Sequence, residues 1–170
     1  MAARPAAFLD RDGVLNRDND FVHRPEDFVW IEGARQAVKR LNDAGHLVFV
    51  VTNQSGVARG LFPIADVAHL HRWIDDELKH IGAHIDAFYV CPHHPTEGKG
   101  EYRIACDCRK PAPGMLLQAM RDFPVDRAAS FLIGDKDRDL AAAQTAGIRG
   151  VRYAGGDLDA LVRRILSGAA

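Results

Sequence analysis

Two carboxylates separated by a single residue stand where a short apolar run ends. Residues 6–9 are Ala-Ala-Phe-Leu, and Asp10-Arg-Asp12-Gly follows them directly. This spacing concentrates negative charge where the backbone opens, as a cation site would require, although a polar turn at a strand end is the plainer explanation. An EF-hand calcium loop is excluded. Counted from Asp10, its third ligand would be Val14, and counted from Asn16 its obligatory glycine would be Phe21.

A second polar motif, Thr52-Asn-Gln-Ser-Gly56, follows the apolar run 47–51. Its hydroxyl and amide groups can donate hydrogen bonds to phosphate oxygens without adding charge, whereas the alternative is an ordinary turn built on Asn53. It is neither a Walker loop nor a dinucleotide-binding fingerprint, because the chain contains no GxxxxGK or GxGxxG segment.

Cations and further carboxylates occur in two later segments. Lys110 can place a point charge on a phosphoryl group, and Arg109 can hold a second anion in a bidentate fork; two solvated loop cations are the alternative. Asp135, Asp137 and Asp139 alternate after another apolar run, a pattern that fits a hard-cation site made of oxygen ligands. Asp137 could instead cap the helix that follows.

The three cysteines of the chain lie close together in one loop. Cys91-x-His93, followed after twelve residues by Cys106-x-Cys108, offers three sulfurs and one imidazole, a complete tetrahedral set for a structural zinc ion. The spacing is not that of a standard zinc finger. His94 could replace His93, the cysteines could be free and buried, and a disulfide between Cys106 and Cys108 would be strained across one residue.

These motifs need a scaffold that brings them together, and the apolar pattern predicts one. Runs of strand length alternate with stretches of helical period. The expected strands are 6–9, 47–51, 87–90, 130–133 and 148–153, and the expected helices are 34–41, one opened by Pro63, one started by Pro113, 140–146 and 157–166. This alternation predicts an α/β, three-layer, Rossmann-like fold with a mostly parallel sheet and with ligands at the carboxyl ends of its strands.

Composition limits the remaining choices. The chain has 170 residues, of which 47% are hydrophobic and 26% charged, so we expect one globular domain over residues 1–170. The formal charge of -1 argues against nucleic acid or an anionic membrane as a partner. The longest apolar run, 47–51, is far too short to span a membrane, and no signal-type apolar core precedes Asp10. We therefore expect a cytoplasmic protein.

Taken together, the four polar motifs, each at a strand end, resemble those of the haloacid dehalogenase superfamily of phosphohydrolases. Within it the chain is most similar to the D-glycero-D-manno-heptose 1,7-bisphosphate 7-phosphatases, and the related histidinol-phosphate phosphatases have a similar layout. The segments that carry the resemblance are Phe8–Asn16, Thr52–Gly60, Cys91–Pro95, Cys106–Pro111 and Gly134–Lys136. The intervals between the motifs are filled by core elements, which predicts a capless fold with a zinc-stabilised loop at 91–108.

The resemblance implies a mechanism. Asp10 would be the nucleophile that forms an aspartyl-phosphate, and Asp12 would act as general acid and then general base. Thr52 and Lys110 would stabilise charge on the phosphoryl group. Mg²⁺ would be held by Asp10, the main-chain oxygen of Asp12, and Asp135. The resemblance also favours His93 over His94 as the zinc ligand.

It further implies a small-molecule sugar bisphosphate as substrate, in the biosynthesis of nucleotide-activated heptose for lipopolysaccharide precursors, with the enzyme acting as a monomer. The residues expected to bind the substrate are Asp18, Asn19, Asp20, Phe21, Asn53, Gln54, Ser55, Arg59, Arg109 and Lys136. The family often has Gly-Tyr near Asp20-Phe21, so Asp20 is a departure. A histidinol-phosphate phosphatase and a zinc-stabilised binding module without catalysis are the alternatives. A polynucleotide 3′-phosphatase is disfavoured because the sequence shows no basic track for DNA.

Overall fold

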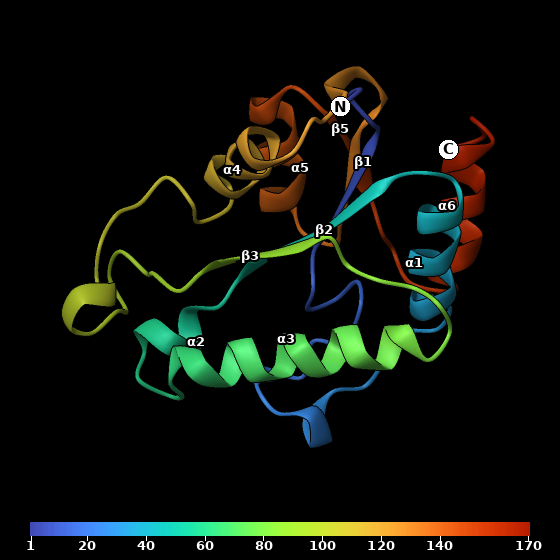
Figure 1. Cartoon of the computed structure of the whole chain (residues 1–170). Coiled ribbons are helices and arrows are strands. Elements are labelled where there is room, and N and C mark those ends of the chain that lie inside the picture. The colour runs from blue at the N-terminus through green and yellow to red at the C-terminus, as the bar shows by residue number, and fades with distance from the viewer.

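Strands and helices alternate along the whole chain, as the apolar pattern predicts (Figure 1). The computed structural model describes residues 1–170. The strands are β1 (Ala6–Leu9), β2 (Leu47–Asn53), β3 (Ala87–Cys91), β4 (Phe131–Gly134) and β5 (Arg149–Arg152). The helices are α1 (Ala34–Asp43), α2 (Ser55–Ala58), α3 (Ile64–Lys79), α4 (Gly114–Asp122), α5 (Asp137–Ala146) and α6 (Leu158–Leu166), with short 3₁₀ turns at Pro25–Asp27, Gly100–Tyr102 and Arg127–Ala129.

The five strands form one parallel sheet in the order β3-β2-β1-β4-β5. The central strand is β1, in which Phe8 pairs with Phe49 on one side and with Leu132 on the other. Because β2 and β4 flank β1 and run in the same direction, the segments that follow all three emerge at one edge. This confirms the predicted parallel sheet and places the polar motifs side by side.

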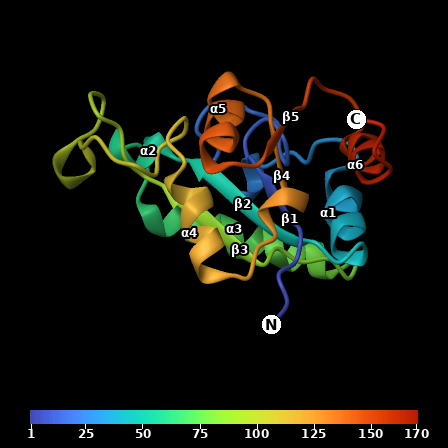
Figure 2. The same ribbon diagram turned by 90° about the horizontal axis from the view of Figure 1, so that it is seen from above.

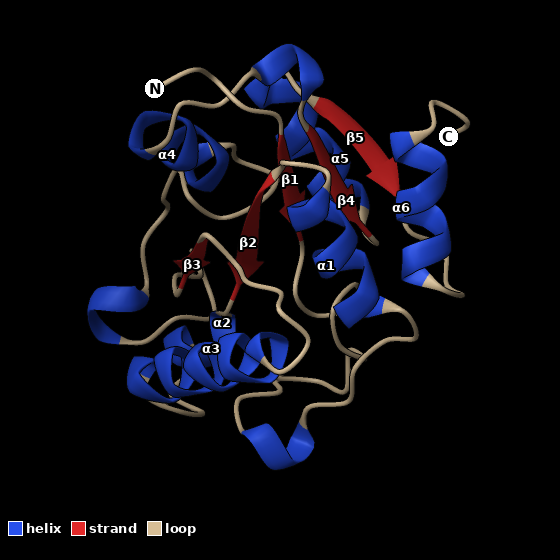
Figure 3. Cartoon of the chain, turned by 45° about the vertical axis from the view of Figure 1, so that its right-hand side comes forward, coloured by secondary structure: helices blue, strands red, loops and turns tan.

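Helices cover both faces of the sheet and give it three layers. Successive residues of β1 alternate between two separate cores: Ala7 and Leu9 join the core under α1, α3 and α6, whereas Ala6 and Phe8 join the core under α4 and α5. The two groups of helices lie on opposite sides of the sheet in Figure 1, and Figures 2 and 3 show the same layering from other directions. The chain therefore has the predicted three-layer α/β fold.

Several element ends differ from the sequence-based prediction. The strand β2 continues for two residues beyond 51, so Thr52 lies inside it, and α5 begins at Asp137 rather than at Leu140. The early start of α5 has a local cause: the Asp139 carboxylate accepts a hydrogen bond from the backbone N–H of Lys136, which caps the first turn. The short helix α2, within a segment expected to be a loop, was not predicted.

The connections that could hold a cap domain contain no separate domain. Between β1 and α1 the chain forms loops and one 3₁₀ turn, and between β2 and β3 it forms only α2, α3 and their connecting loops. This agrees with the predicted capless fold and leaves the carboxyl edge of the sheet bordered by loops. No helix is both long enough and apolar enough to cross a bilayer.

Candidate active site

A buried cluster of charge stands at the carboxyl end of β1. The Asp10 side chain is almost fully buried, and its Oδ1 accepts hydrogen bonds from Lys110 Nζ at 2.9 Å and from the Arg11 backbone N–H at 2.9 Å. Lys110 Nζ also donates to the Val51 carbonyl at 2.8 Å and lies 2.7 Å from Asp139 Oδ1. Burial raises the pKa of Asp10 to about 7, and the positive charge of Lys110 opposes that rise. One buried cation is thus shared by two carboxylates.

The end of β2 fixes the segment that carries this lysine. Asn53 Oδ1 accepts a hydrogen bond from the Lys110 backbone N–H at 3.0 Å, and Asn53 Nδ2 donates to the Lys110 carbonyl at 3.1 Å. This amide clamp joins residues that are 57 positions apart. Asn53 was expected to bind substrate. It does line the pocket described below, but its amide also holds the backbone of the neighbouring cation.

Asp12 is held by donors on both of its oxygens. Oδ1 accepts from Arg11 Nη2 and from Asn16 Nδ2, each at 2.9 Å, while Oδ2 accepts from Gln54 Nε2 at 2.9 Å. The same Gln54 amide donates to Thr52 Oγ1 at 2.8 Å, so the Thr52 hydroxyl keeps its own proton for donation. These contacts fix the position of both Asp12 side-chain oxygens next to the first strand.

Three carboxylates converge in a geometry that suits a divalent cation. One oxygen from each of Asp10, Asp135 and Asp139 lies within 4.8 Å of the other two. Asp135 Oδ1 is buried without any hydrogen-bond partner, a costly state that a bound cation would relieve. Gly13 lies against this carboxylate at φ +90°, where an added Cβ would come within 2.2 Å of Asp135 Oδ2. Carboxylate oxygens are the ligands that Mg²⁺ prefers, so these residues fit it.

The structure brings together the predicted magnesium ligands Asp10 and Asp135 and adds Asp139, which the sequence pattern had grouped with Asp135 and Asp137 as a cation site. The Asp12 carboxylate lies outside this group, which leaves its main-chain oxygen for the role that the resemblance implies. The Asp137 prediction was wrong on both counts. Its side chain faces solvent and pairs with Arg152, and it is the first residue of α5 rather than its N-cap.

Three cysteines and one histidine of the loop 91–108 form a cluster of four side chains. The Sγ–Sγ distances among Cys91, Cys106 and Cys108 are 3.0–3.6 Å, and His93 Nδ1 lies 3.3 Å from Cys108 Sγ. A tetrahedral zinc ion with Zn–S bonds of about 2.3 Å implies ligand separations of roughly 3.8 Å, close to these values. Burial raises the pKa of Cys91 and of Cys108, and a bound cation would reverse this effect by binding the thiolates.

Two alternatives for this loop do not fit the geometry. His94 turns away from the sulfurs, because its Nδ1 accepts hydrogen bonds from the backbone N–H groups of Thr96 and Glu97. The cysteines are free, and the 3.4 Å between the sulfurs of Cys106 and Cys108 is far longer than a disulfide bond of about 2.05 Å.

A small pocket of about 170 Å³ opens beside Asp12. It is lined by Asp12, Asp18, Asp20, Phe21, Asn53, Gln54, Ser55 and Arg138. All but Arg138 were predicted site residues. Burial and the neighbouring Asp12 carboxylate raise the pKa of Asp18, which reflects the crowding of negative charge at this edge. A phosphorylated substrate therefore needs added positive charge to approach.

Comparison with known proteins supplies the family. A family model described as HAD-hydrolase-like matches residues 107–163. The D-glycero-beta-D-manno-heptose-1,7-bisphosphate 7-phosphatase of Rhodopseudomonas palustris is 50% identical over 163 residues, covering 96% of this chain and 91% of the relative. The enzyme of the same name from Escherichia coli K12 is 46% identical over 144 residues, covering 85% of this chain and 75% of the relative.

A solved structure agrees with these relatives. The D,D-heptose 1,7-bisphosphate phosphatase of B. bronchiseptica, complexed with magnesium and phosphate, superposes with a TM-score of 0.85 at 36% identity, covering 97% of this chain and 99% of that chain. The chain belongs to the D-glycero-D-manno-heptose 1,7-bisphosphate 7-phosphatase family. This confirms the resemblance drawn from the motifs and, with it, membership of the haloacid dehalogenase superfamily.

In this member of the heptose bisphosphate phosphatase family, Arg138 lines the pocket and Arg59 lies over the ring of Phe21, another lining residue. Burial and the positive charges of Arg138 and Arg59 lower the pKa of Arg109. Arg109 donates only a long hydrogen bond to the His93 carbonyl, and Arg59 lies 3.7 Å from Glu97. Such weakly compensated positive charge favours an anionic ligand. Sequence reasoning selected Arg59 and Arg109 but missed Arg138.

The remaining predicted substrate residues lie at the rim. Lys136 Nζ lies 3.5 Å from Asp135 Oδ2 and is half-exposed, and Asn19 is exposed outside the pocket. The residues Asp20 and Phe21 have φ values of 51° and 57°, in the left-handed region. This conformation accounts for the glycine that the family often has near this position, since glycine adopts it without strain and aspartate does not.

Proposed function

We propose that this chain is a Mg²⁺-dependent phosphatase that removes the C7 phosphate of D-glycero-D-manno-heptose 1,7-bisphosphate. One observation carries the proposal: the buried Asp10 carboxylate contacts Lys110 at 2.9 Å and lies within 4.8 Å of Asp135 and Asp139, at the edge of a parallel sheet. That is the arrangement needed by a carboxylate nucleophile that must meet phosphorus without being repelled by it.

The reaction has two steps. An oxygen of Asp10 forms a bond to phosphorus while the bond from phosphorus to the sugar oxygen breaks, and Asp12 supplies the proton that this leaving oxygen needs. In the second step Asp12 takes a proton from water, whose oxygen attacks phosphorus and releases inorganic phosphate and free Asp10. The donors around Asp12 support its role as acceptor in this step.

Charge on the transferring phosphoryl group is balanced by residues already in position. Lys110 Nζ and the Thr52 hydroxyl would donate to its equatorial oxygens. Mg²⁺ held by Asp10, Asp135 and the Asp12 main-chain oxygen would neutralise the repulsion between the carboxylate and the phosphate dianion.

The zinc loop would act mechanically. Cys108 immediately precedes Arg109 and Lys110, so a cation bound by the cysteine cluster would fix the start of the segment that supplies both groups. The amide clamp from Asn53 fixes the same segment from the other side. Together they hold Lys110 Nζ where Asp10 needs it.

The arginines around the pocket support a substrate with a second phosphate. Arg59 and Arg109 would receive the phosphate that is not hydrolysed, while Asp18, Asp20 and Phe21 line the sugar end. The proposal includes a place in the biosynthesis of nucleotide-activated heptose for lipopolysaccharide precursors, and a monomeric enzyme in the cytoplasm. Its partners are small molecules rather than nucleic acid or membrane.

Turnover of three phosphates with Mg²⁺ tests this function. We expect heptose 1,7-bisphosphate to be hydrolysed with a far higher kcat/KM than histidinol phosphate or fructose 1,6-bisphosphate, and EDTA to abolish all phosphate release. A preference for histidinol phosphate would refute the substrate assignment but leave the proposed mechanism unchanged. If none of the three compounds releases phosphate, the alternative of a zinc-stabilised binding module without catalysis is favoured.

A further inference from the structure

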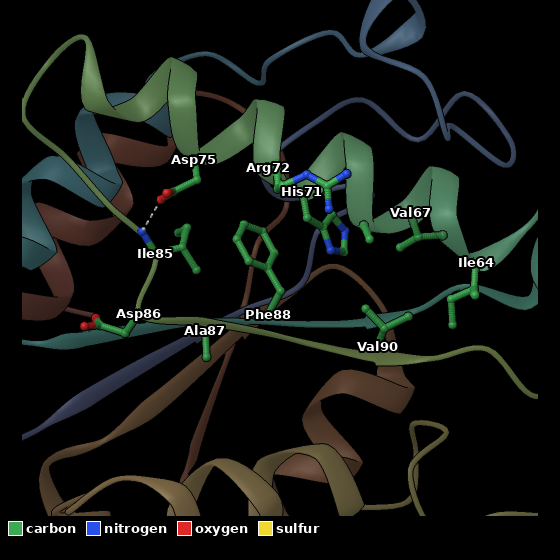
Figure 4. Close-up of a pocket in the computed structure, with 11 residues that line it drawn as sticks. Ile64, Val67, His71, Arg72, Asp75, Ile85, Asp86, Ala87, Phe88 and Val90 are labelled. Atoms are coloured by element: carbon green, nitrogen blue, oxygen red, sulfur yellow. Dashed lines mark hydrogen bonds between the residues drawn. The ribbon is translucent and has the colours of Figure 1, made fainter.

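A histidine outside the catalytic motifs is buried behind Asp12. His71 projects from α3 toward the sheet in the middle of a groove of about 500 Å³ between α3 and β3 (Figure 4). Its ring stacks on Phe88, with centroids 4.5 Å apart and planes 17° from parallel. Only 5% of the residue is exposed.

The ring contacts a charged partner rather than an apolar one. His71 Nε2 lies 3.3 Å from Arg11 Nη1. A guanidinium group has only donors, so Nε2 must accept, which requires a neutral ring with its proton on Nδ1. Burial and the positive charge of Arg11 lower the pKa of His71 to about 3, so the ring is neutral wherever the enzyme works.

The other side-chain donors of Arg11 mainly contact Asp12, the proposed acid-base residue. Nη2 and Nε donate to the Asp12 carboxylate, and Nη2 also donates to the Val22 carbonyl. Arg11 is completely buried, so each unpaired N–H would carry a desolvation cost. His71 supplies the acceptor for the remaining arm, Nη1. The ring therefore limits rotation of the guanidinium group and, through it, of Asp12.

We propose that His71 is a positioning residue that holds the Arg11 guanidinium, and through it the Asp12 carboxyl group, in the orientation needed to protonate the leaving sugar oxygen. This inference rests on the proposed role of Asp12 as general acid. It requires two properties of residue 71: a side chain that fills the space against Phe88, and an acceptor directed at Arg11 Nη1.

Two substitutions separate these properties. His71→Phe keeps the aromatic stacking and removes the acceptor, whereas His71→Gln places an amide oxygen on a side chain of similar reach. We expect His71→Phe to lower kcat by on the order of tenfold with little change in KM, because the substrate pocket is untouched. His71→Gln should recover most of that loss. Circular dichroism and melting curves show whether either variant is folded.

The leaving group provides the decisive readout. An alkyl phosphate such as the heptose bisphosphate needs a proton on its leaving oxygen, whereas p-nitrophenyl phosphate releases a stable phenolate without one. His71→Phe should therefore lower kcat/KM by on the order of tenfold for the sugar phosphate and leave kcat/KM for the aryl ester nearly unchanged. A merely structural role would lower both alike. Equal losses on the two substrates, or no better activity in His71→Gln than in His71→Phe, would overturn the inference.

Asp12→Asn distinguishes this inference from the proposed function. The comparison uses kcat/KM, which reports the first step and is insensitive to the later role of Asp12 as base. If Asp12→Asn loses kcat/KM selectively toward the sugar while His71→Phe does not, the acid role of Asp12 stands and the inference about His71 is refuted. If kcat/KM of Asp12→Asn shows no such selectivity, the acid role of Asp12 and the inference about His71 are both refuted.

Chemical rescue of His71→Ala by imidazole provides an independent test. The groove already reaches the ring, so imidazole in solution can enter the space left in His71→Ala. Imidazole should raise the activity of His71→Ala severalfold and leave His71→Phe unchanged, because the phenyl ring fills that space. Equal stimulation of both variants would count against the inference. If His71→Ala does not fold, the Phe and Gln variants carry the test.

Discussion

Replacing Lys110 by methionine tests the buried charge cluster most severely. Lys110 is 1% exposed and is the only cation in contact with both Asp10 and Asp139, at 2.9 Å and 2.7 Å. Removing one partner of a buried ion pair costs about 3–5 kcal/mol. Since domains of this size are stable by about 5–15 kcal/mol, Lys110→Met should lose a large part of its free energy of unfolding. Mg²⁺ should restore some of it by neutralising the same carboxylates.

The loss should depend on pH with a definite sign. Without Lys110, the pKa of Asp10 rises still further above its value of about 3.9 in the unfolded chain. The folded state then binds more protons than the unfolded state at neutral pH, so stability must increase as the pH falls from 8 toward 5. Urea unfolding followed by circular dichroism measures this, with the surface variant Lys39→Met as a control that should match the parent. If Lys110→Met unfolds at the same urea midpoint as the wild type, or if its stability does not change with pH, the reasoning is refuted.

Three further predictions follow from other parts of the molecule. Asp20→Gly should raise the free energy of unfolding by about 0.5 kcal/mol, because glycine removes the left-handed strain but has a more flexible unfolded chain; a lower urea midpoint would contradict this. Chelating zinc should abolish activity and expose loop 91–108 to limited proteolysis, whereas protein purified without bound zinc yet fully active would argue against a metal there. Arg40 lowers the pKa of Asp159, so this carboxylate stabilises the fold less as the pH falls below about 4. In acid unfolding curves, Asp159→Asn should lack that part of the wild-type decline in stability. Parallel acid curves would refute the last of these.

The sheet was predictable because its strands are short apolar runs separated by helical periods. Each polar motif followed such a run, so parallel topology alone placed Asp10, Thr52 and Asp135 at one edge. The cysteine–histidine cluster was equally predictable, since Cys91 and Cys108 belong to two pairs of candidate ligands, each pair separated by one residue. The resemblance then supplied roles that no residue pattern could.

What remained hidden depends on contacts between distant segments. Arg11 stands between two acids in the sequence and His71 lies in a separate helix, and no spacing in the sequence shows that they meet across 60 residues of chain. Asp139 was predicted only as one of three alternating carboxylates of a cation site, and only the folded structure shows that it also contacts Lys110. Arg138 stood in a charged run with no feature to distinguish it from a solvated cation.

The covalent step is the claim on which the whole mechanism depends, and mass spectrometry of acid-quenched enzyme tests it most directly. Enzyme mixed with heptose 1,7-bisphosphate and Mg²⁺, quenched during turnover and digested, should yield one peptide heavier by a phosphoryl group, with the modification on Asp10. Asp10→Asn should remain folded, show no such peptide and release no phosphate. A phosphoryl group on another residue, or undiminished turnover by Asp10→Asn, would contradict the mechanism.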